Sequence, residues 1–336
     1  MSRLRPTARL FRGLIAVAAG AAIAFLSVAA ASADDGPSVR LGVLQFGTVN
    51  WEIDVIQHHG LDKANGVTLD VVRLANKDAT SIALNAADVD MIVTDWIWVS
   101  RQRDAGADYT FVPYSEAAGS VMVHPDSGIN SVLDLDGKVL GVAGSPLDKS
   151  WLLLRAYSIQ KFDKDIGDLV RPAYAAPPLL NEKFSQREFD GVLNYWNYTA
   201  RLRAQKMTEL IKVQDLLPAL GVPGRLALIG YVFREEWAAD NPEALSGFLA
   251  ASAAARKIML ESDDEWTRLM PKTGAKDEAT LNAFRDGFRD GVPKATGPVQ
   301  AESIASAFEI VAKLGGRALV GKSTMLAPGT VWSGGE

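Results

Sequence analysis

The sequence predicts an α/β fold of two similar lobes, each with a parallel-rich sheet flanked by helices. Short apolar runs alternate with helical patterns along most of the chain, as in parallel sheets with crossover helices. One pattern also occurs twice: an Asp, an apolar run, a polar pair and a Trp, from Asp90 to Trp96 and from Asp190 to Trp196. One such repeat can arise by chance, but helical patterns precede both copies. We therefore expect two lobes, with a ligand cleft beyond the carboxyl ends of their strands.

The first 33 residues have the pattern of a secretory signal peptide. Four arginines precede an apolar, alanine-rich run from Leu14 to Ala31, and small residues lead up to Ala33. We expect cleavage after Ala33 and a mature protein in the periplasm. A membrane anchor is the alternative, because the run approaches the length that spans a bilayer. Its alanine content and the polar residues that follow favour cleavage.

Charge and cysteine content exclude several classes of function. Four of the 35 basic residues and none of the 40 acidic residues precede Asp34, so the remaining chain has 31 basic and 40 acidic residues, a net charge of −9. This balance argues against nucleic acid or an anionic membrane as a partner. The absence of cysteine excludes disulfides, thiolate metal sites and a Cys nucleophile. It also suits an oxidising compartment.

The chain of 336 residues is long enough for two domains. We expect the first lobe at 34–119, the second at 120–226 and a return to the first at 227–336. The strands expected are 39–44, 67–74, 91–93, 109–114, 120–124, 138–143, 169–172, 190–193 and 226–233. The helices expected are 53–58, 80–87, a helix capped by Ser145, 179–184, 200–210, 244–260, 266–270, 278–288 and 302–314, with a loop at 47–52.

Polar and aromatic residues gather where the predicted strands end, as expected for a pocket that binds a small molecule. The candidates are Asn50, Trp51, Glu52, Asn76, Thr94, Asp95, Trp96, Glu116, Ser145, Asp148, Tyr195, Trp196 and Asn197. Each also has a purely structural interpretation, since a Trp can fill the core and an Asp can cap a helix. Only their clustering at successive strand ends favours binding.

The charges of these candidates point to the ligand class. Glu52, Asp95 and Glu116 are acidic, whereas Lys77 and Lys149 are the basic residues nearby. This pattern favours a cationic or nitrogen-containing aromatic solute held by stacking or cation–π contacts. Free N–H groups at the helix expected after Ser145 would suit an anionic group, so a zwitterion fits both. Carboxylates could also bind a hard cation, but no EF-hand spacing is present and we expect no metal.

No convincing catalytic set is present. The chain has three His, no Cys and no Gly-x-Ser-x-Gly motif. His58 and His59 precede Gly60, where a helix is expected to end and an imidazolium is favourable. They could also act as ligands or acid–base groups. We expect a binding protein, with no enzymatic activity and no cofactor.

Several ordered segments resemble a known family. They include the runs at 39–44, 56–71, 83–93, 126–142, 189–196 and 241–249, of which Leu-Asp-Leu-Asp-Gly-Lys at 133–138 is the most specific. From Val39 to Leu260 the chain resembles the solute-binding proteins of ABC importers in the nitrate/taurine/sulfonate and NMT1/THI5-like superfamily. The acidic and aromatic residues at the expected pocket positions differ from those of its anion-binding members.

The resemblance implies a type II periplasmic-binding fold, with two lobes that close about a hinge on a small-molecule ligand. It further implies delivery of the solute to an ABC permease and its ATPase at the inner membrane. We expect the protein to be a monomer. Two alternatives are a THI5-like enzyme that acts on a heterocycle and a sensory solute-binding module.

Overall fold

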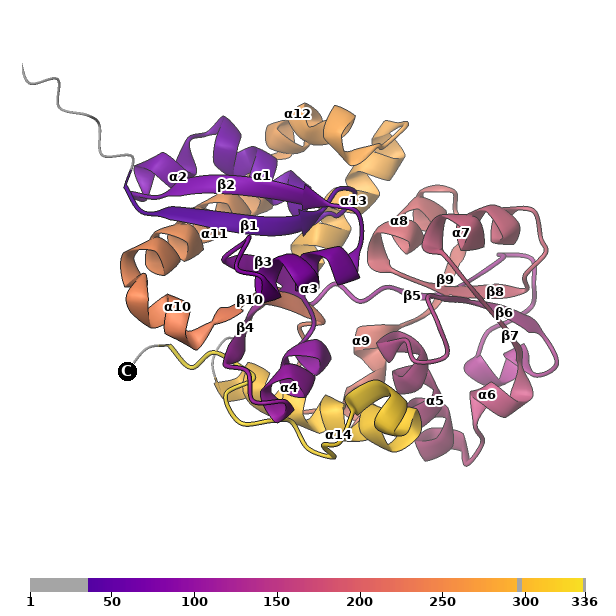
Figure 1. Ribbon diagram of the computed structural model, residues 1–336. Helices are drawn as coiled ribbons and strands as arrows, with labels where there is room; N and C mark the ends of the chain where they lie inside the picture. The colour runs from indigo at the N-terminus through magenta and orange to yellow at the C-terminus, as the bar shows by residue number, and fades with distance from the viewer. Residues whose placement is uncertain (1–35, 295–297, 335–336) are drawn as a thin grey trace, which may run out of the picture. The chain divides into compact units, whose positions relative to one another are not determined.

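Two five-stranded sheets organise the computed structural model of the chain (Figure 1). The structure describes residues 36–294 and 298–334, so the predicted signal peptide and its cleavage site lie outside the described residues. The first sheet has the order β2-β1-β3-β10-β4 and the second the order β7-β6-β8-β5-β9. We call the elements around them lobe 1 and lobe 2. All described residues belong to one compact unit.

The strands of lobe 1 are β1 (Ser38–Leu44), β2 (Thr68–Leu74), β3 (Met91–Thr94), β4 (Tyr109–Ser115) and β10 (Ile229–Arg234). Those of lobe 2 are β5 (Ser120–Val123), β6 (Val139–Ala143), β7 (Arg171–Ala175), β8 (Gly191–Asn194) and β9 (Thr208–Lys212). In each sheet one strand, β10 or β5, is antiparallel to its neighbours. Each of these two strands follows a crossing of the chain between the sheets. The chain therefore crosses at 116–119 and again at 221–228.

The helices of lobe 1 are α1 (Val49–His58), α2 (Leu61–Ala64), α3 (Lys77–Asn85) and α4 (Trp96–Asp104). The helical elements of lobe 2 are η1 (Val132–Leu135), α5 (Lys149–Phe162), α6 (Ile166–Leu169), α7 (Pro177–Ser185), α8 (Trp196–Ala204), α9 (Val213–Leu216) and η2 (Pro218–Leu220). After β10 come α10 (Glu235–Asp240), α11 (Pro242–Glu261), α12 (Asp263–Thr273), α13 (Glu278–Gly291) and α14 (Pro298–Val320). None of the described helices is long and apolar enough to cross a membrane.

Two large groups of buried side chains run between the lobes. In one, Trp96 of α4 and Phe308 of α14 belong to the same apolar cluster as Trp151 of α5. Figure 1 shows α14 beside α5, so the last long helix contacts lobe 2. In the other, Trp51 of α1 and Phe284 of α13 share a cluster with Ala200 of α8. The two sheets are thus joined by packed helices as well as by the crossing segments.

Three predicted elements are wrong. The expected loop at 47–52 is mostly helix, because α1 already begins at Val49. Ser145 does not cap α5; Asp148 does, by accepting the N–H groups of Ser150 and Trp151. The helix expected at 200–210 is α8 followed by β9, which pairs with β5. The other predicted strands and helices correspond to observed elements with shifted ends, but the helices α2, α4, α6, α9 and α10 are absent from the prediction.

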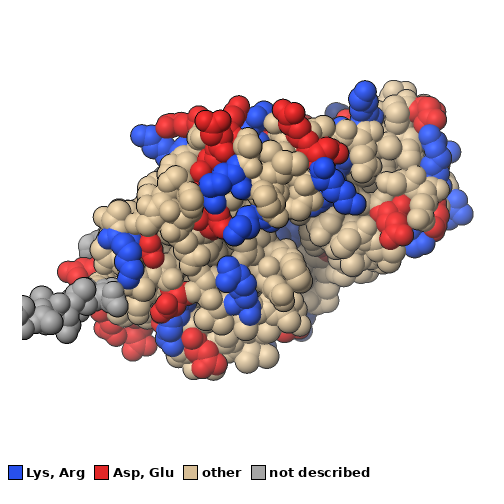
Figure 2. All heavy atoms as spheres, turned by 90° about the horizontal axis from the view of Figure 1, so that it is seen from above, with Lys and Arg blue, Asp and Glu red and all other residues tan. Residues whose placement is uncertain are grey.

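Charged side chains of both signs are mixed over the face seen in Figure 2. Most of the large buried residues are apolar, as expected for a sheet covered by helices.

Candidate functional site

The repeated sequence pattern forms two equivalent corners, one in each lobe. Asp90 precedes β3 and accepts the backbone N–H of Arg40 at 2.8 Å, and Asp190 precedes β8 and accepts that of Val139 at 2.8 Å. Each Asp also donates its own N–H to the carbonyl of the same partner. A carboxylate therefore fixes the start of each central strand. Both strands then lead directly into a helix at the lobe junction.

A charged cluster joins the two lobes where these strands end. Asp95 caps α4 by accepting the N–H of Trp98 at 3.0 Å. Its other carboxylate oxygen lies 2.9 Å from the Lys149 ammonium of α5 in lobe 2 and 3.9 Å from the Lys77 ammonium of α3. The side chains of Asp95 and Lys149 are only 15% and 16% exposed. We call Lys77, Asp95, Asp148, Lys149 and Tyr195 the strand-end cluster.

The lobe 2 side of the strand-end cluster is a phenol and a second carboxylate. The Tyr195 hydroxyl donates to Asp148 at 3.3 Å, and the Tyr195 side chain remains partly exposed. The Asp148 carboxylate lies beside Lys149 and at the first turn of α5. The cluster therefore holds two ammonium groups, two carboxylates and one hydroxyl, contributed by both lobes.

Burial and charge shift the pKa values of this cluster in opposite directions. Burial raises the pKa of Asp95, but Lys149 and Lys77 outweigh it and hold that pKa well below its usual range. For Asp148 burial outweighs Lys149, so its pKa is raised. Burial and the neighbouring Asp148 also raise the pKa of Tyr195. Asp95 is thus a fixed charge, whereas Asp148 is the carboxyl that ionises less readily.

Four further predicted residues lie at the same strand ends with local structural roles. Asn76 caps α3 by accepting the N–H of Ala79 at 2.9 Å. Thr94 is buried at the end of β3. Ser145 is exposed and its hydroxyl accepts the N–H of Leu147. Asn197, in the first turn of α8, makes no side-chain hydrogen bond with the described residues.

The structure contradicts the expectation that Glu52 faces a ligand. Glu52 lies on α1, fully buried in lobe 1, and accepts hydrogen bonds from Ser252 and Tyr231. Burial raises its pKa, and the Arg256 guanidinium 3.7 Å away opposes that shift. One carboxylate oxygen therefore accepts both hydrogen bonds inside the lobe, while the other has no hydrogen-bond partner among the described residues and lies 3.7 Å from the Arg256 guanidinium. Glu52 gives no support to a cationic ligand.

Two of the predicted aromatic residues are also core residues. The Trp96 ring is fully buried, and its Nε1 donates to the carbonyl of Ala227 at 2.9 Å. The Trp51 ring is 5% exposed and contacts Trp196 edge-on at 5.8 Å. Asn50, beside it, binds the carbonyls of Leu44 and Gly47 and so closes the corner between β1 and α1. Trp51 and Trp96 are therefore buried supports of the lobe junction, and Asn50 fixes the corner beside Trp51.

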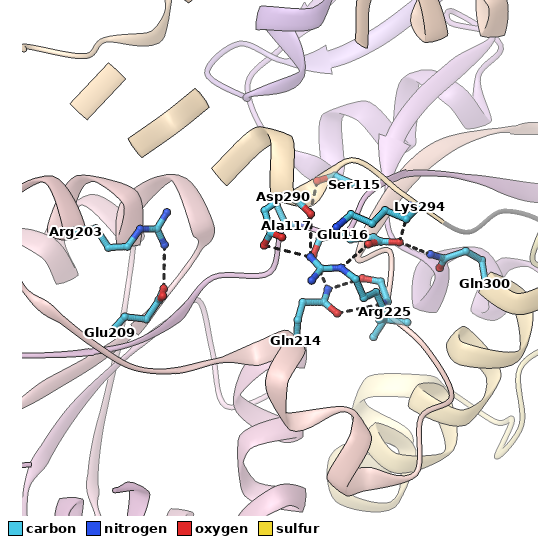
Figure 3. A network of polar contacts seen from close by, with 11 residues as sticks. Ser115, Glu116, Ala117, Arg203, Glu209, Gln214, Arg225, Asp290, Lys294 and Gln300 are labelled. Atoms are coloured by element: carbon cyan, nitrogen blue, oxygen red, sulfur yellow. Dashed lines mark hydrogen bonds and ion pairs between the residues drawn. The ribbon is translucent and has the colours of Figure 1, made fainter. Parts of the chain in front are cut away.

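Glu116 of the first crossing and Trp196 at the start of α8 belong to a second place, beside the crossing segments. Glu116 is fully buried, 2.7 Å from Arg225 of the second crossing and 2.7 Å from Gln300 of α14 (Figure 3). Beside it lies a cavity of about 240 Å³, which we call the hinge cavity. It is lined by Glu116, Ala117, Ala118, Gly119, Ser120, Trp196, Arg203, Glu209, Lys212, Gln214, Arg225, Asp286, Gly287 and Asp290. None of the strand-end cluster lines it.

Sequence reasoning missed the residues that partner Glu116 and line the hinge cavity. Arg225 follows η2 in a stretch without secondary structure, and Gln300 lies in the last long helix. No spacing in the sequence links them to Glu116. A charged residue inside an irregular crossing segment is the one feature that could have drawn attention to Arg225. Among the described residues no group of three or more His, Cys, Asp or Glu could hold a metal ion.

Several solved structures are similar to this chain. The chain is similar to the periplasmic aliphatic sulphonate binding protein SsuA from Escherichia coli, with 19% identity over 89% of this chain and 93% of that one and a TM-score of 0.68. It is also similar to the alkanesulfonate-binding protein SsuA from Xanthomonas axonopodis pv. citri bound to MOPS, with 19% identity, coverage of 88% and 99% and a TM-score of 0.63. A DszB mutant in complex with biphenyl-2-sulfinic acid shares 12% identity, with coverage of 82% and 92% and a TM-score of 0.57.

These likenesses establish the fold. The two sheets flanked by helices form the type II periplasmic-binding fold, as the sequence predicts. Among curated protein sequences, no relative matches the chain. The family model described as NMT1/THI5 like matches residues 54–266, which is more than half of the chain. The protein therefore belongs to the NMT1/THI5-like family.

Proposed function

We propose that the protein is the substrate-binding component of an ABC importer and that it holds a small polar solute between its lobes. The observation that carries this proposal is the strand-end cluster, in which Asp95 and Lys149 from different lobes meet at 2.9 Å. In open α/β sheets, ligands bind beyond the carboxyl ends of strands. The family and the fold support the same assignment. Closure about the two crossing segments would enclose the solute, and an ABC permease with its ATPase would receive it.

The charges of the strand-end cluster indicate which class of solute would fit. Two ammonium groups, Lys77 and Lys149, face two carboxylates, Asp95 and Asp148. A solute with one cationic and one anionic or acceptor group would satisfy both kinds of partner. A nitrogen-containing zwitterion therefore fits better than a simple cation, because Glu52 and Glu116 are occupied elsewhere. The partly exposed Tyr195 ring adds a surface on which an aromatic solute could stack.

We infer a binding role in preference to an enzymatic one. None of the three histidines lies in the strand-end cluster: His59 contacts Glu265 of α12, and His124 stacks on Phe184 of α7. His58 contacts only the His59 ring among the described rings. An enzyme acting on a heterocycle would require a different set of groups. Turnover of any bound solute by the purified protein would favour that alternative.

The test begins with mass spectrometry of small molecules released from the mature protein after gentle purification and denaturation. We expect a zwitterionic or amine-containing solute in stoichiometric amount. Isothermal titration with that solute should show at least about a tenfold loss of affinity in Asp148→Asn, the loss of one charge-assisted hydrogen bond. Lys257→Met provides a matched control, because Lys257 is exposed on α11 and makes no ion pair within the described residues.

Two outcomes would overturn the proposal. A solute whose affinity is the same in Asp148→Asn, Lys149→Met and the parent protein does not bind at the strand-end cluster. No bound molecule, together with no thermal shift from amines, zwitterions, heterocycles or sulfonates, would contradict a solute-binding role. Uptake of the identified solute by cells that lack the gene then tests delivery to a permease.

A further inference from the structure

The hinge cavity is built from both lobes and from both crossing segments. Its walls are the first crossing at 116–119, the ends of β9 and α8 in lobe 2, Arg225 of the second crossing, and α13. Its volume of about 240 Å³ is slightly below that of ordinary small-molecule pockets, which begin near 300 Å³. It therefore has room for a small molecule of a few non-hydrogen atoms.

Every carboxylate that lines the hinge cavity already has a cationic partner. Arg225 pairs with Glu116 and Asp290, as Figure 3 shows. Arg203 pairs with Glu209 at 2.9 Å, and Glu209 also accepts the Ser120 hydroxyl. The fourth carboxylate, Asp286, contacts Arg285 of its own helix at 3.0 Å. None of these carboxylates is left to attract a cation.

Lys212 is different, because it makes no ion pair or hydrogen bond through its ammonium group with any described residue. Two backbone donors of the same wall are also unused. The N–H groups of Ala118 and Gly119 donate no hydrogen bond within residues 36–294 and 298–334. Ala118 is only 6% exposed, and a buried N–H without a partner costs free energy until an acceptor reaches it. This wall of the cavity therefore holds three donors without a partner among the described residues, the Lys212 ammonium and two backbone N–H groups.

From these groups we propose that the hinge cavity is a second binding site, for a small organic monocarboxylate. Its carboxylate oxygens accept from Lys212 and from the N–H groups of the first crossing, and its apolar part lies against the Trp196 ring. A doubly charged anion is disfavoured, because four carboxylates surround the cavity and only one ammonium is unpaired. This site is separate from the strand-end cluster and does not depend on the solute held there.

The test is isothermal titration of the mature protein with acetate, butyrate, benzoate and sulfate. Because Lys212 is solvent-exposed, we expect weak binding of a monocarboxylate, with a dissociation constant of about 1 mM, and no binding of sulfate. Lys212→Met should lower the affinity for the carboxylate by about tenfold, whereas Lys257→Met should leave that affinity unchanged. In two-dimensional NMR spectra, the amide resonances of Ala118 and Gly119 should shift on addition of the same carboxylate.

The proposal is overturned if none of the three carboxylates binds at about 10 mM, a concentration well above the dissociation constant expected of such a site. It is also overturned if Lys212→Met binds the carboxylate as the parent does, or if only sulfate binds. If Lys149→Met abolished carboxylate binding and Lys212→Met did not, the carboxylate would bind at the strand-end cluster. That result would leave the proposed importer function standing and remove only the hinge site.

Discussion

The corner at Asp95 in lobe 1 and the corner at Tyr195 in lobe 2 share a backbone and differ in what they present to the other lobe. In both, a nine-residue helix precedes a turn with a residue in left-handed conformation, Ala87 at φ 58° and Arg187 at φ 61°. An Asp then fixes a four-residue strand, and a nine-residue helix follows. The same hydrogen bonds join helix, turn and strand in each copy.

The difference lies in what each corner presents to the other lobe. The lobe 1 corner buries Trp96 in the core and offers the carboxylate of Asp95. The lobe 2 corner has Tyr195 in the place of Asp95, and its Trp196 is only half-buried and contacts Trp51 of lobe 1. One backbone design therefore supplies a fixed charge on one side and aromatic contact on the other. The lobes are similar in fold and complementary in chemistry.

The largest effect that distinguishes the corners should come from their tryptophans. Trp96→Ala should lower the free energy of unfolding by about 4 kcal/mol, because it leaves a cavity in the core and removes the bond to Ala227. Trp196→Ala should cost about 2 kcal/mol, since its half-buried ring loses mainly the contacts with Trp51 and Gly287. Urea unfolding followed by circular dichroism measures both values.

Trp96→Phe is the matched control for this comparison. It keeps most of the volume but loses the Nε1 donor and part of the ring, so it should cost less than Trp96→Ala. Equal losses for Trp96→Ala and Trp196→Ala would show that the two rings are equivalent supports of the fold. The distinction between a core ring and an interlobe ring would then be wrong.

The next effect concerns the charge of the lobe 1 corner. Asp95→Asn should lower the free energy of unfolding at pH 7 by about 3 kcal/mol, because it leaves the largely buried Lys149 ammonium unpaired. The pKa of Asp95 is lowered in the folded protein, so its contribution is complete above the unfolded-state pKa of about 3.9. It is lost as the pH falls towards the folded-state pKa. The difference between parent and variant should therefore shrink below about pH 4.

Tyr195→Phe, at the equivalent position of lobe 2, is the comparison for this pH series. Its hydroxyl makes one long hydrogen bond at a partly exposed site, so we expect a loss below about 1 kcal/mol. A difference between Asp95→Asn and the parent that stays constant from pH 7 to pH 3 would contradict the ion-pair argument.

Local patterns predicted the strands of these corners, while the surroundings of those strands depend on distant residues. The Asp and the apolar run at 90–93 and 190–193 are adjacent in sequence, so the strands could be found. The burial of Glu52 could not be predicted, because its partners Ser252 and Tyr231 lie about 200 residues away along the chain. Asp95 lies at the lobe junction, but its pairing with Lys149 depends on how the two lobes pack. Periodicity carries no information about such contacts.

The smallest effect tests the feature that the corners share. Asp190→Asn should cost less than about 1 kcal/mol, because an amide oxygen can still accept the N–H of Val139. Asp90→Asn should cost about 0.5 kcal/mol more, since Asp90 also pairs with the half-exposed Arg40 guanidinium and exposed ion pairs contribute little. Urea unfolding of both variants under the same conditions gives the difference.

Arg40→Met isolates that extra contribution. It removes the guanidinium and keeps the backbone N–H that Asp90 accepts, so its cost should be at least the difference between the two Asn variants, since the guanidinium also donates to the Asp88 carbonyl. In the Arg40→Met background, Asp90→Asn should then cost as much as Asp190→Asn does in the parent, because only the shared strand-start bond remains. If Asp190→Asn proved the more damaging of the two, the carboxylates would not have the same role. The two corners would then be alike in shape alone.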